Sequence, residues 1–304
     1  MKVALVGAGR NRNGIGEYIG KCFHQNGATV IAVLGTTEKT SRSASSALTR
    51  YGIDAHAYTD FKAMVERESP DTVVIASPAP THYGYLIRSV DAGLHVFCEK
   101  PFIWHEGGNI QESLETIFNK AENKNLTIAM NTQWPFSLPY YEELCGPIDG
   151  RKIDTFFIRL SPTSVGKEMV VDSVPHALSI LFHVFGNGEI INPDSELGEE
   201  EMTLQFHYCS QLKVCKVLIR LIRREFQPRD FSFGFNDKIV RRIIDLESYD
   251  IYFSHANRTL KLVDPLDLSV QDFIAAVRDH RKPLVGKTHI INNTNLLRQI
   301  YDSC

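Results

Sequence analysis

The chain has 304 residues, of which 43% are hydrophobic, and this suffices for two ordinary domains that each bury a core. Its 33 basic and 36 acidic residues give a formal net charge of -3, so there is no electrostatic reason to expect a nucleic acid or an anionic membrane as partner. The six cysteines form no CxxC pair, which favours reduced thiols and no cysteine-built metal site. No leader peptide and no apolar segment long enough to span a bilayer is recognised, so we expect a cytoplasmic protein.

From residue 2 to about 130, short β-branched runs alternate with amphipathic stretches. This alternation is typical of a parallel sheet that carries helices on both faces. Helices are expected at 60–67 and 109–124, between six strands at 2–6, 29–34, around 56, 72–76, 95–98 and 127–130. The sequence therefore predicts an α/β domain over residues 1–130, a doubly wound parallel sheet of the Rossmann type.

After residue 131 the pattern changes. Two Trp-Pro and Leu-Pro pairs at 134–135 and 138–139 break the periodicity, and strand-like segments follow at 152–160, 202–208 and 213–222. One helix is expected at 175–185, ended by a Gly-Asn-Gly stop signal, and the tail is helical at 269–278 and 292–301. These features predict a second, mainly antiparallel domain over residues 131–304.

The first strand is followed by Gly7 and Gly9, which allow a tight turn and a close backbone approach to a pyrophosphate at the amino end of the next helix. Arg12 stands where a plain GxGxxG would have its third glycine, so residues 10–13 resemble a short insertion. The strand before this loop and the amphipathic stretch after it favour nucleotide binding, although glycines that only turn the chain remain the alternative. The predicted cofactor contacts in this loop are Gly7, Gly9, Arg10, Asn11, Gly14 and Gly16.

The second strand ends at Thr36 and Thr37, where NAD-preferring proteins usually carry an acidic residue for the ribose hydroxyls. No carboxylate follows the strand directly, and the threonine hydroxyls with Lys39, Arg42 and Arg10 can accept a phosphate. This favours NADP, with NAD as the alternative, and adds Thr36, Thr37 and Lys39 to the predicted cofactor contacts. Lys39 and Arg42 could instead be solvated charges on a helix surface.

Glu99, Lys100 and Pro101 come at the end of the apolar run 94–98. Ligands of such sheets bind beyond the carboxyl ends of the strands, so Lys100 is expected to face the nucleotide site, where a substrate carbonyl can meet a nicotinamide. The alternative is a strand-end lysine that pairs with Glu99.

The chain resembles the Gfo/Idh/MocA oxidoreductase family, of the glucose-fructose oxidoreductase and inositol dehydrogenase type. The resemblance rests on the glycine loop, Ser77-Pro78 followed by His82, Glu99-Lys100-Pro101, Asp172 with His176, and the run 270–277. It implies a Rossmann domain joined to an α+β domain with an open, mostly antiparallel sheet, and a substrate held between that sheet and the nicotinamide. Family reactions are mostly hydride transfers on sugars, cyclitols and small carbonyl or hydroxy compounds, while some members reduce imines and others act as ligand-sensing regulators.

Hydride transfer to a carbonyl leaves negative charge on oxygen, which needs a proton donor and a positive charge nearby. We assign Lys100 to polarise the substrate oxygen, His176 to give or take the proton, and Asp172 to orient the site electrostatically. Asp172 and His176 are one helical turn apart at the start of the predicted helix. As alternatives, Asp172 caps that helix and His176 is satisfied by its neighbours.

Further contacts follow from the resemblance. Ser77, Pro78 and His82 occupy the loop that passes the nicotinamide ribose in that family, so they are predicted cofactor contacts together with Glu99 and Lys100. His82 could instead only pack. Trp134 follows the last Rossmann strand and is either a substrate-facing aromatic or a hinge anchor. The predicted substrate contacts are Lys100, Trp134, Asp172 and His176, and no metal is expected.

Members that oxidise polyols commonly have a glycine and a second aspartate where this chain has Val174 and Ser179. The departure disfavours polyol oxidation more than reduction. We therefore expect an NADP-dependent reductase or dehydrogenase of a small, biosynthetic carbonyl, hydroxy or imine metabolite. The alternative is a nucleotide- or ligand-sensing regulator or partner-binding protein that keeps the fold without the reaction.

The strands at 202–208 and 213–222 are expected to expose one sheet face, which a second copy of the chain usually covers. A homo-oligomer, a dimer or a tetramer, is therefore expected. The arginines at 220, 223, 224, 241 and 242 lie in alternating apolar sequence without a groove-reading motif, which favours a solvated or interface surface over a nucleic-acid patch.

Overall fold

The computed structural model describes residues 1–9, 14–104 and 109–304. Contacts between Cα atoms divide the chain into two compact units, residues 1–131 with 266–290 and residues 132–265 with 291–304. The sequence placed residues 266–290 in the second domain, whereas their contacts group them with the first unit.

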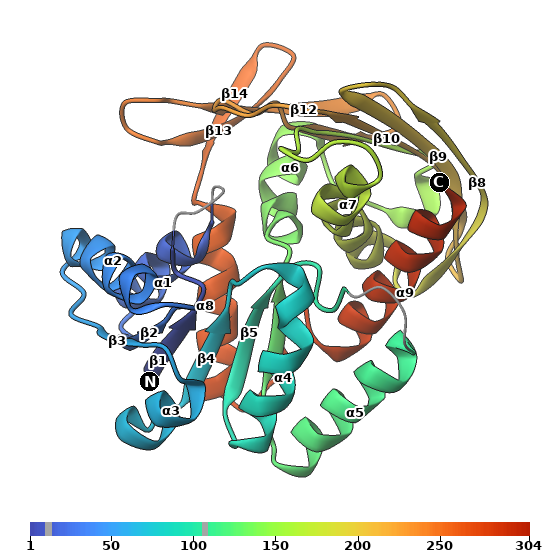
Figure 1. Cartoon of the computed structure of the whole chain (residues 1–304). Coiled ribbons are helices and arrows are strands. Elements are labelled where there is room, and N and C mark those ends of the chain that lie inside the picture. Colours follow the sequence, from blue (N-terminus) through green and yellow to red (C-terminus); the bar gives the residue numbers. More distant parts are fainter. Residues whose placement is uncertain (10–13, 105–108) are drawn as a thin grey trace. The chain divides into compact units, whose positions relative to one another are not determined.

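The first unit contains a six-stranded, wholly parallel sheet with strand order β3-β2-β1-β4-β5-β6 (Figure 1). Its strands are β1 Lys2–Val6, β2 Thr29–Leu34, β3 His56–Tyr58, β4 Thr72–Ile75, β5 His95–Glu99 and β6 Ile128–Asn131. The predicted α/β class and all six predicted strands are confirmed. The order reverses between β1 and β4, and ligands of such sheets bind outside the carboxyl ends of the strands at this reversal.

Three helices of this unit begin at side chains that cap them. Thr37 forms a capping box with Thr40, and the side chains of Asp60 and Asn109 accept backbone hydrogen bonds at the next predicted helices. The helices are α1 Gly16–Gln25, α2 Glu38–Leu48, α3 Phe61–Glu68, α4 His82–Asp91, α5 Ile110–Asn123 and α8 Pro265–Arg278, with short 3-10 turns at Thr49–Tyr51 and Ala79–Thr81.

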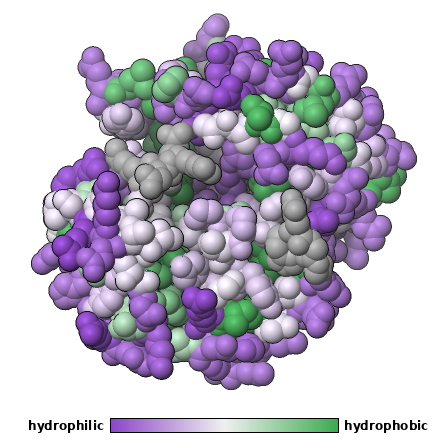
Figure 2. Space-filling model, in the orientation of Figure 1, coloured by the Kyte–Doolittle hydropathy of each residue, from purple (hydrophilic) through white to green (hydrophobic). Residues whose placement is uncertain are grey.

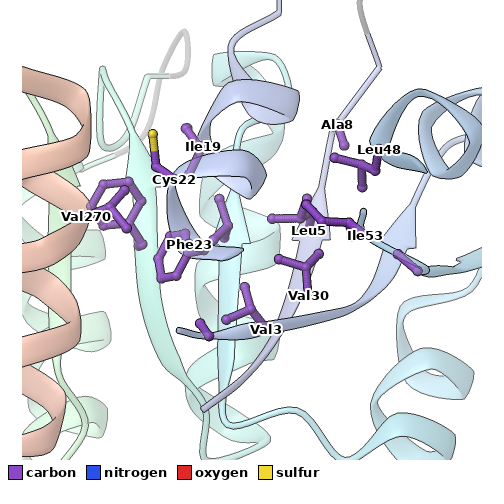
Figure 3. Close-up of a cluster of buried hydrophobic side chains, with 14 of the residues drawn as sticks. Val3, Leu5, Ala8, Ile19, Cys22, Phe23, Val30, Leu48, Ile53 and Val270 are labelled. Carbon is purple, nitrogen blue, oxygen red and sulfur yellow. The ribbon is translucent and has the colours of Figure 1, made fainter. Parts of the chain in front are cut away.

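One face of the parallel sheet is buried against α1 and α8 (Figure 3). Phe23 of α1, Phe97 of β5 and Phe273 of α8 meet there with ring centroids 5.4–6.0 Å apart, and Val270 adds an aliphatic contact. Contacts of this kind contribute stability through apolar burial. They explain why α8, although far along the chain, belongs to the first unit.

The second unit contains an eight-stranded sheet with strand order β14-β13-β12-β11-β7-β10-β9-β8. Only β7 and β10 pair in parallel and the other neighbours are antiparallel, which confirms the predicted mostly antiparallel sheet. The strands are β7 Thr155–Leu160, β8 Gly188–Leu197, β9 Glu201–Ser210, β10 Val214–Ile222, β11 Ser232–Phe235, β12 Lys238–Ile244, β13 Ile251–His255 and β14 Arg258–Leu262.

Helices α6 Leu138–Cys145 and α7 Glu168–Phe185 lie on one face of this sheet (Figure 1). The unit also holds 3-10 turns at Trp134–Ser137 and Gly150–Lys152 and most of α9 Lys287–Ser303. Strand β8 was not predicted because Asn192 and Pro193 interrupt its pattern. It is an edge strand whose register shifts between Ile191 and Asp194, and edges with bulges tolerate proline.

Helix α7 begins at Glu168, seven residues before the predicted start, and Pro175 lies inside it. The prediction placed the proline at the first turn, where it is most easily accommodated, but a buried apolar face keeps the helix continuous through it. Asp172 and His176 therefore lie in the body of α7, so Asp172 is not its cap.

Within the described residues, α7 is also the helix long and apolar enough to cross a membrane by length and composition, which the sequence reading had not recognised. However, 67% of that stretch is buried inside the structure, and core helices of globular folds meet the same criterion. On the face drawn in Figure 2, hydrophilic side chains predominate and hydrophobic ones form small separate groups.

Candidate active site

The phosphate loop of the first unit is built from three glycines with different tasks. Gly7 has φ of +86°, and a Cβ there would lie 2.5 Å from the backbone nitrogen of Ser77. A Cβ on Gly16 would lie 2.7 Å from the carbonyl oxygen of Gly7, whereas one on Gly9 would meet nothing within 4 Å. Gly7 thus makes the tight turn, Gly16 allows close helix packing, and Gly9 leaves open space for a ligand.

These are the three roles of glycine in a dinucleotide-binding turn, so the described residues fit a nicotinamide dinucleotide. Gly16 takes the place of the third glycine, displaced by the insertion. Gly14 is half-buried at the border of this insertion. Arg10 and Asn11, two of the predicted cofactor contacts, lie outside the described residues.

At the end of β2, Thr36 and Lys39 are exposed at the amino end of α2. The Thr37 hydroxyl is already engaged, because it accepts a hydrogen bond from the Thr40 backbone nitrogen at 3.2 Å. Arg42 pairs with Glu38 one turn earlier at 3.2 Å. Thr36, Lys39 and the helix amino end are therefore the groups here with donors to spare for an anion.

Lys100 is the first residue after β5, and it is half-buried. Its neighbour Glu99 is only 7% exposed and accepts a hydrogen bond from the side-chain amide of Asn131, its partner in the ladder with β6. Asn131 is 1% exposed and was not singled out in the sequence. A buried amide that fixes the preceding carboxylate restrains the strand end from which Lys100 extends.

His82 joins the loops that follow β4 and β5. It is 1% exposed, its Nε2 lies 2.7 Å from the carbonyl oxygen of Ser77, and its Nδ1 lies 2.8 Å from that of Pro101. Both ring nitrogens are therefore engaged between the two loops, the arrangement that the packing alternative describes. Burial, with a smaller contribution from the Lys100 cation, holds the pKa of His82 below 6.5, against the opposing effect of the backbone groups of Ser77, Pro101 and Phe102.

Ser77 and Pro78 occupy the turn between β4 and the 3-10 turn, with Pro78 exposed and Ser77 half-buried. The Ser77 hydroxyl lies 2.7 Å from that of Thr81. A continuous set of close approaches thus runs from Gly7 to Ser77, through His82, to Pro101 beside Lys100. The three turns after β1, β4 and β5 are assembled as one edge of the sheet.

In the second unit, Asp172 and His176 lie four residues apart on α7, so they share one face of the helix. Both are half-buried, and the hydroxyl of Ser164 donates to a carboxylate oxygen of Asp172 at 3.3 Å. The helical spacing predicted for this pair is present, although it lies deeper in the helix than expected.

Ser179, one turn beyond His176 on α7, is fully buried. Its hydroxyl lies 2.6 Å from that of Thr132 and accepts a hydrogen bond from the Asn293 amide at 3.0 Å. The same amide donates to the carbonyl of Pro175 at 2.8 Å. Ser179 therefore links α7 to Thr132 and Asn293 through hydrogen bonds, and its side chain is a hydroxyl and not a carboxylic acid.

Trp134 is 4% exposed and stacks on Phe231 with ring centroids 3.6 Å apart and an interplanar angle of 16°. The guanidinium carbon of Arg242 lies 5.4 Å from the centroid of the Trp134 ring and 5.6 Å from that of Phe231. The aromatic face of Trp134 is thus engaged within the second unit. Arg242 was counted only as part of a basic cluster in the sequence.

That cluster does not form one basic patch. Arg220 and Arg241 are exposed, Arg223 pairs with Glu200 at 2.7 Å, and Arg242 is packed against aromatic rings. Among residues 1–9, 14–104 and 109–304, no group of three or more His, Cys, Asp or Glu side chains is arranged to hold a metal ion.

Parts of this chain are similar in sequence to known proteins, and its fold is similar to solved structures. Residues 1–132 match the family model described as the oxidoreductase family with an NAD-binding Rossmann fold, GFO_IDH_MocA. Inositol 2-dehydrogenase of Klebsiella pneumoniae is 34% identical over 103 residues, which are 33% of this chain and 28% of that protein. The scyllo-inositol 2-dehydrogenase (NADP(+)) of Bacillus subtilis is 34% identical over 90 residues, 30% of this chain and 26% of that protein.

These matches span only about a quarter of the length of the curated relatives. Over the whole chain the similarity is one of fold. The structure of UDP-N-acetylglucosamine 3-dehydrogenase from Acidithiobacillus ferrooxidans aligns with 100% of this chain and 97% of its own, with a TM-score of 0.75 and 15% sequence identity. Residues 1–132 are thus similar to the Rossmann domain of the Gfo/Idh/MocA oxidoreductase family, and the whole chain shares the fold of a solved dehydrogenase.

Proposed function

We propose that the protein is an NAD(P)-dependent oxidoreductase that transfers a hydride between a nicotinamide cofactor and a small carbonyl, hydroxy or imine metabolite. The observation that carries the proposal is the position of Lys100. It follows β5 directly, and the contacts from Gly7 through Ser77 and His82 to Pro101 join its turn to the phosphate loop.

In this proposal Gly7, Gly9, Gly14 and Gly16 hold the pyrophosphate at the amino end of α1, with Arg10 and Asn11 from the inserted residues. Ser77 and Pro78 contact the nicotinamide ribose, with Glu99 next to them. A bound nicotinamide cofactor supplies or accepts the hydride. We infer NADP as the preferred form because Thr36 and Lys39 are exposed at the amino end of α2, and because one curated relative is named as NADP-linked.

Lys100 donates a hydrogen bond to the substrate oxygen and stabilises the negative charge that develops there. His176 gives the proton during reduction and takes it during oxidation, and Asp172 favours the cationic imidazole form needed for giving it. Ser179 is buried in hydrogen bonds to Thr132 and Asn293, and α7 carries no carboxylate after His176. We therefore favour reduction, in a biosynthetic setting, over polyol oxidation.

The test is a titration of the purified protein with NADPH and NADH followed by fluorescence, and then a panel of carbonyl and imine substrates. Lys39→Gln should weaken NADPH binding by about fivefold to tenfold and leave NADH binding unchanged, whereas the same change at exposed Lys62 should affect neither. Tighter binding of NADH than NADPH would discard the cofactor preference. Dinucleotide binding without turnover of any substrate would favour the ligand-sensing regulator instead.

We also propose a homo-oligomer, a dimer or a tetramer, that acts in the cytoplasm. The support for self-association is the open face of the second-unit sheet, where Val214, Leu218 and Ile222 of β10 alternate with buried residues and are at least partly exposed. Light scattering of the full chain tests this, and Leu218→Glu should shift the protein towards the monomer. A monomer at micromolar concentration would refute it.

A further inference from the structure

The arginine pair at 241 and 242 is split by strand geometry. Successive side chains of a strand point to opposite faces, and Arg242 of β12 shares the face of buried Val240. Val240 pairs with Phe233 of β11, and Tyr141 of α6 stacks on Phe233 at 5.3 Å. Arg242 therefore points to the helix-covered face of the sheet, while Arg241 is exposed on the other face.

A second arginine, Arg229, lies next to Arg242. An Nη of Arg242 donates to the carbonyl oxygen of Arg229 at 2.6 Å. The Nε atoms of both side chains are buried without a hydrogen-bond partner. In the described part of the chain, no carboxylate oxygen comes within 4.0 Å of either guanidinium, although most other partly buried arginines, such as Arg223, form such pairs.

Two unneutralised cations side by side are electrostatically unfavourable. Burial, followed by the charge of Arg229, lowers the pKa of Arg242 to about 10, and the smaller opposing effects of Asp264 and Asp230 offset this only in part. Arg242 still carries its charge at neutral pH. The cluster therefore has an excess of positive charge that an anion would balance.

The neighbouring surface is suited to a small organic anion. Trp134 and Phe231 form a stacked pair, and Arg242 lies over both rings. The cation is thus held in place by the aromatic pair, and its planar fork of donors is restrained in direction. Guanidinium groups bind carboxylate and phosphate oxygens through two parallel hydrogen bonds.

We propose that Arg242 and Arg229, with Trp134 and Phe231 beside them, form a binding site for the oxyanion group of an acidic substrate, a carboxylate or a phosphate ester. The inference rests on the proposed function in that it names the substrate class of the same reaction. It differs from the neutral inositols in the names of the curated relatives. Arg242 is a specificity-determining residue and takes no part in proton transfer.

The binding test uses the full chain with Trp104→Phe, which leaves Trp134 as the single tryptophan. Inorganic phosphate and malonate are the probes, myo-inositol is the neutral control, and binding is followed by Trp134 fluorescence and by calorimetry. At least one anion should saturate a signal that myo-inositol does not produce. Arg242→Gln should weaken its binding by about tenfold or more, whereas Arg241→Gln, the same change on the opposite face of the same strand, should stay within about twofold.

Thermal unfolding with and without the anion distinguishes a purely structural role of Arg242 from a role in anion binding. If Arg242→Gln only lowers the melting temperature but keeps the full anion-induced rise, the proposal is overturned. Arg229→Gln, a variant at the other guanidinium, should also reduce that rise and provides the test if the first variant does not fold. No saturable signal from either anion, by fluorescence or calorimetry, would equally refute the site.

Turnover distinguishes this inference from the proposed function. With hexoses, their 6-phosphates and hexuronates offered alongside each reduced cofactor, an acidic substrate should be used at least about tenfold better than its neutral counterpart, and Arg242→Gln should raise its KM more than it lowers kcat. Whether the 6-phosphates or the hexuronates are used better shows whether the site prefers a phosphate ester or a carboxylate. Equal use of neutral and acidic compounds overturns the inference alone, whereas anion binding without any turnover counts against the oxidoreductase alone.

Discussion

The two units position their candidate functional residues in different ways. In the first unit, Gly7, Ser77 and Lys100 follow the ends of three neighbouring parallel strands, and a close backbone approach and the buried His82 ring bring their turns together. In the second unit, His176 and Arg242 project from a helix and from a sheet face, and side-chain contacts fix their surroundings. A backbone requirement restricts the residue type and leaves a sequence signature, whereas many side chains can meet a packing requirement.

The largest expected effect is on the reaction rate, when the charge that Lys100 of the first unit contributes is removed. Lys100→Ala should lower kcat by about 10²- to 10⁴-fold, because the charge that stabilises the developing oxyanion is lost. Dinucleotide binding should change by less than about fivefold, since the phosphate loop is untouched. Steady-state kinetics and cofactor titration measure the two quantities, and Lys62→Ala on exposed α3 serves as control. A variant that keeps wild-type kcat would remove Lys100 from the mechanism.

The next prediction separates two glycines of one loop. Gly16→Ala should destabilise the fold by about 1–3 kcal/mol, because its Cβ would press on the Gly7 carbonyl at 2.7 Å and backbone must move. Gly9→Ala should leave stability within about 0.5 kcal/mol of wild type and weaken dinucleotide binding, since its Cβ would enter open space. Urea unfolding and NADPH titration distinguish these outcomes. Equal loss of stability in both variants would contradict the assignment.

The same contrast explains how much the sequence could predict. The strands of the first unit were located to within a residue or two because continuous β-branched runs are bounded by glycine and proline turns. In the second unit the long strands β9 and β10 were found from their alternation, but the interrupted strand β8 and the early start of α7 were not. Local pattern does not report a bulge at Pro193, nor a tertiary core that carries a helix through Pro175.

The candidate site likewise contains residues that the sequence predicted and residues that it did not. Lys100 and the glycines were recognised because a strand-end motif places them. Asn131, which holds Glu99, and Arg242, which packs on Trp134, have no signature because their roles depend on residues far away in the chain. His82 was recognised by its position, but only its two carbonyl partners show that it positions loops.

A smaller effect concerns the pH dependence of stability in the first unit. His82 and His95 of the first unit have pKa values lowered by burial, and His95 accepts a hydrogen bond from the Thr127 backbone nitrogen at 2.9 Å. In the unfolded chain they take up protons near pH 6.5, so the unfolded state binds more protons and stability falls as pH drops from 6.5 towards 5. Each histidine can contribute at most about 1.4 kcal/mol per pH unit.

Urea unfolding at pH 7.5, 6.5, 5.5 and 5.0 measures this dependence. His82→Gln should have a shallower loss of stability between pH 6.5 and 5 than wild type, whereas the same change at exposed His24 should leave the slope as it was. If both variants keep the full slope, the neutral form of His82 is not what acidification disrupts, and the loops after β4 and β5 are held by other contacts.

The smallest effect tests whether side-chain contacts position α7. Ser179→Ala removes the hydroxyl that bonds Thr132 and Asn293 and should cost about 1–2 kcal/mol, because two buried partners lose a hydrogen bond. Ser173→Ala is the matched control on the same helix, also buried, and should be close to neutral since alanine favours the helix. Thermal unfolding gives the stability of each variant.

If Ser179→Ala also raises KM for an acidic substrate without changing cofactor affinity, the Ser179 contacts set the position of His176. If Ser179→Ala is as stable as Ser173→Ala, the Ser179 hydrogen bonds do not stabilise α7, and apolar packing alone holds the helix in place.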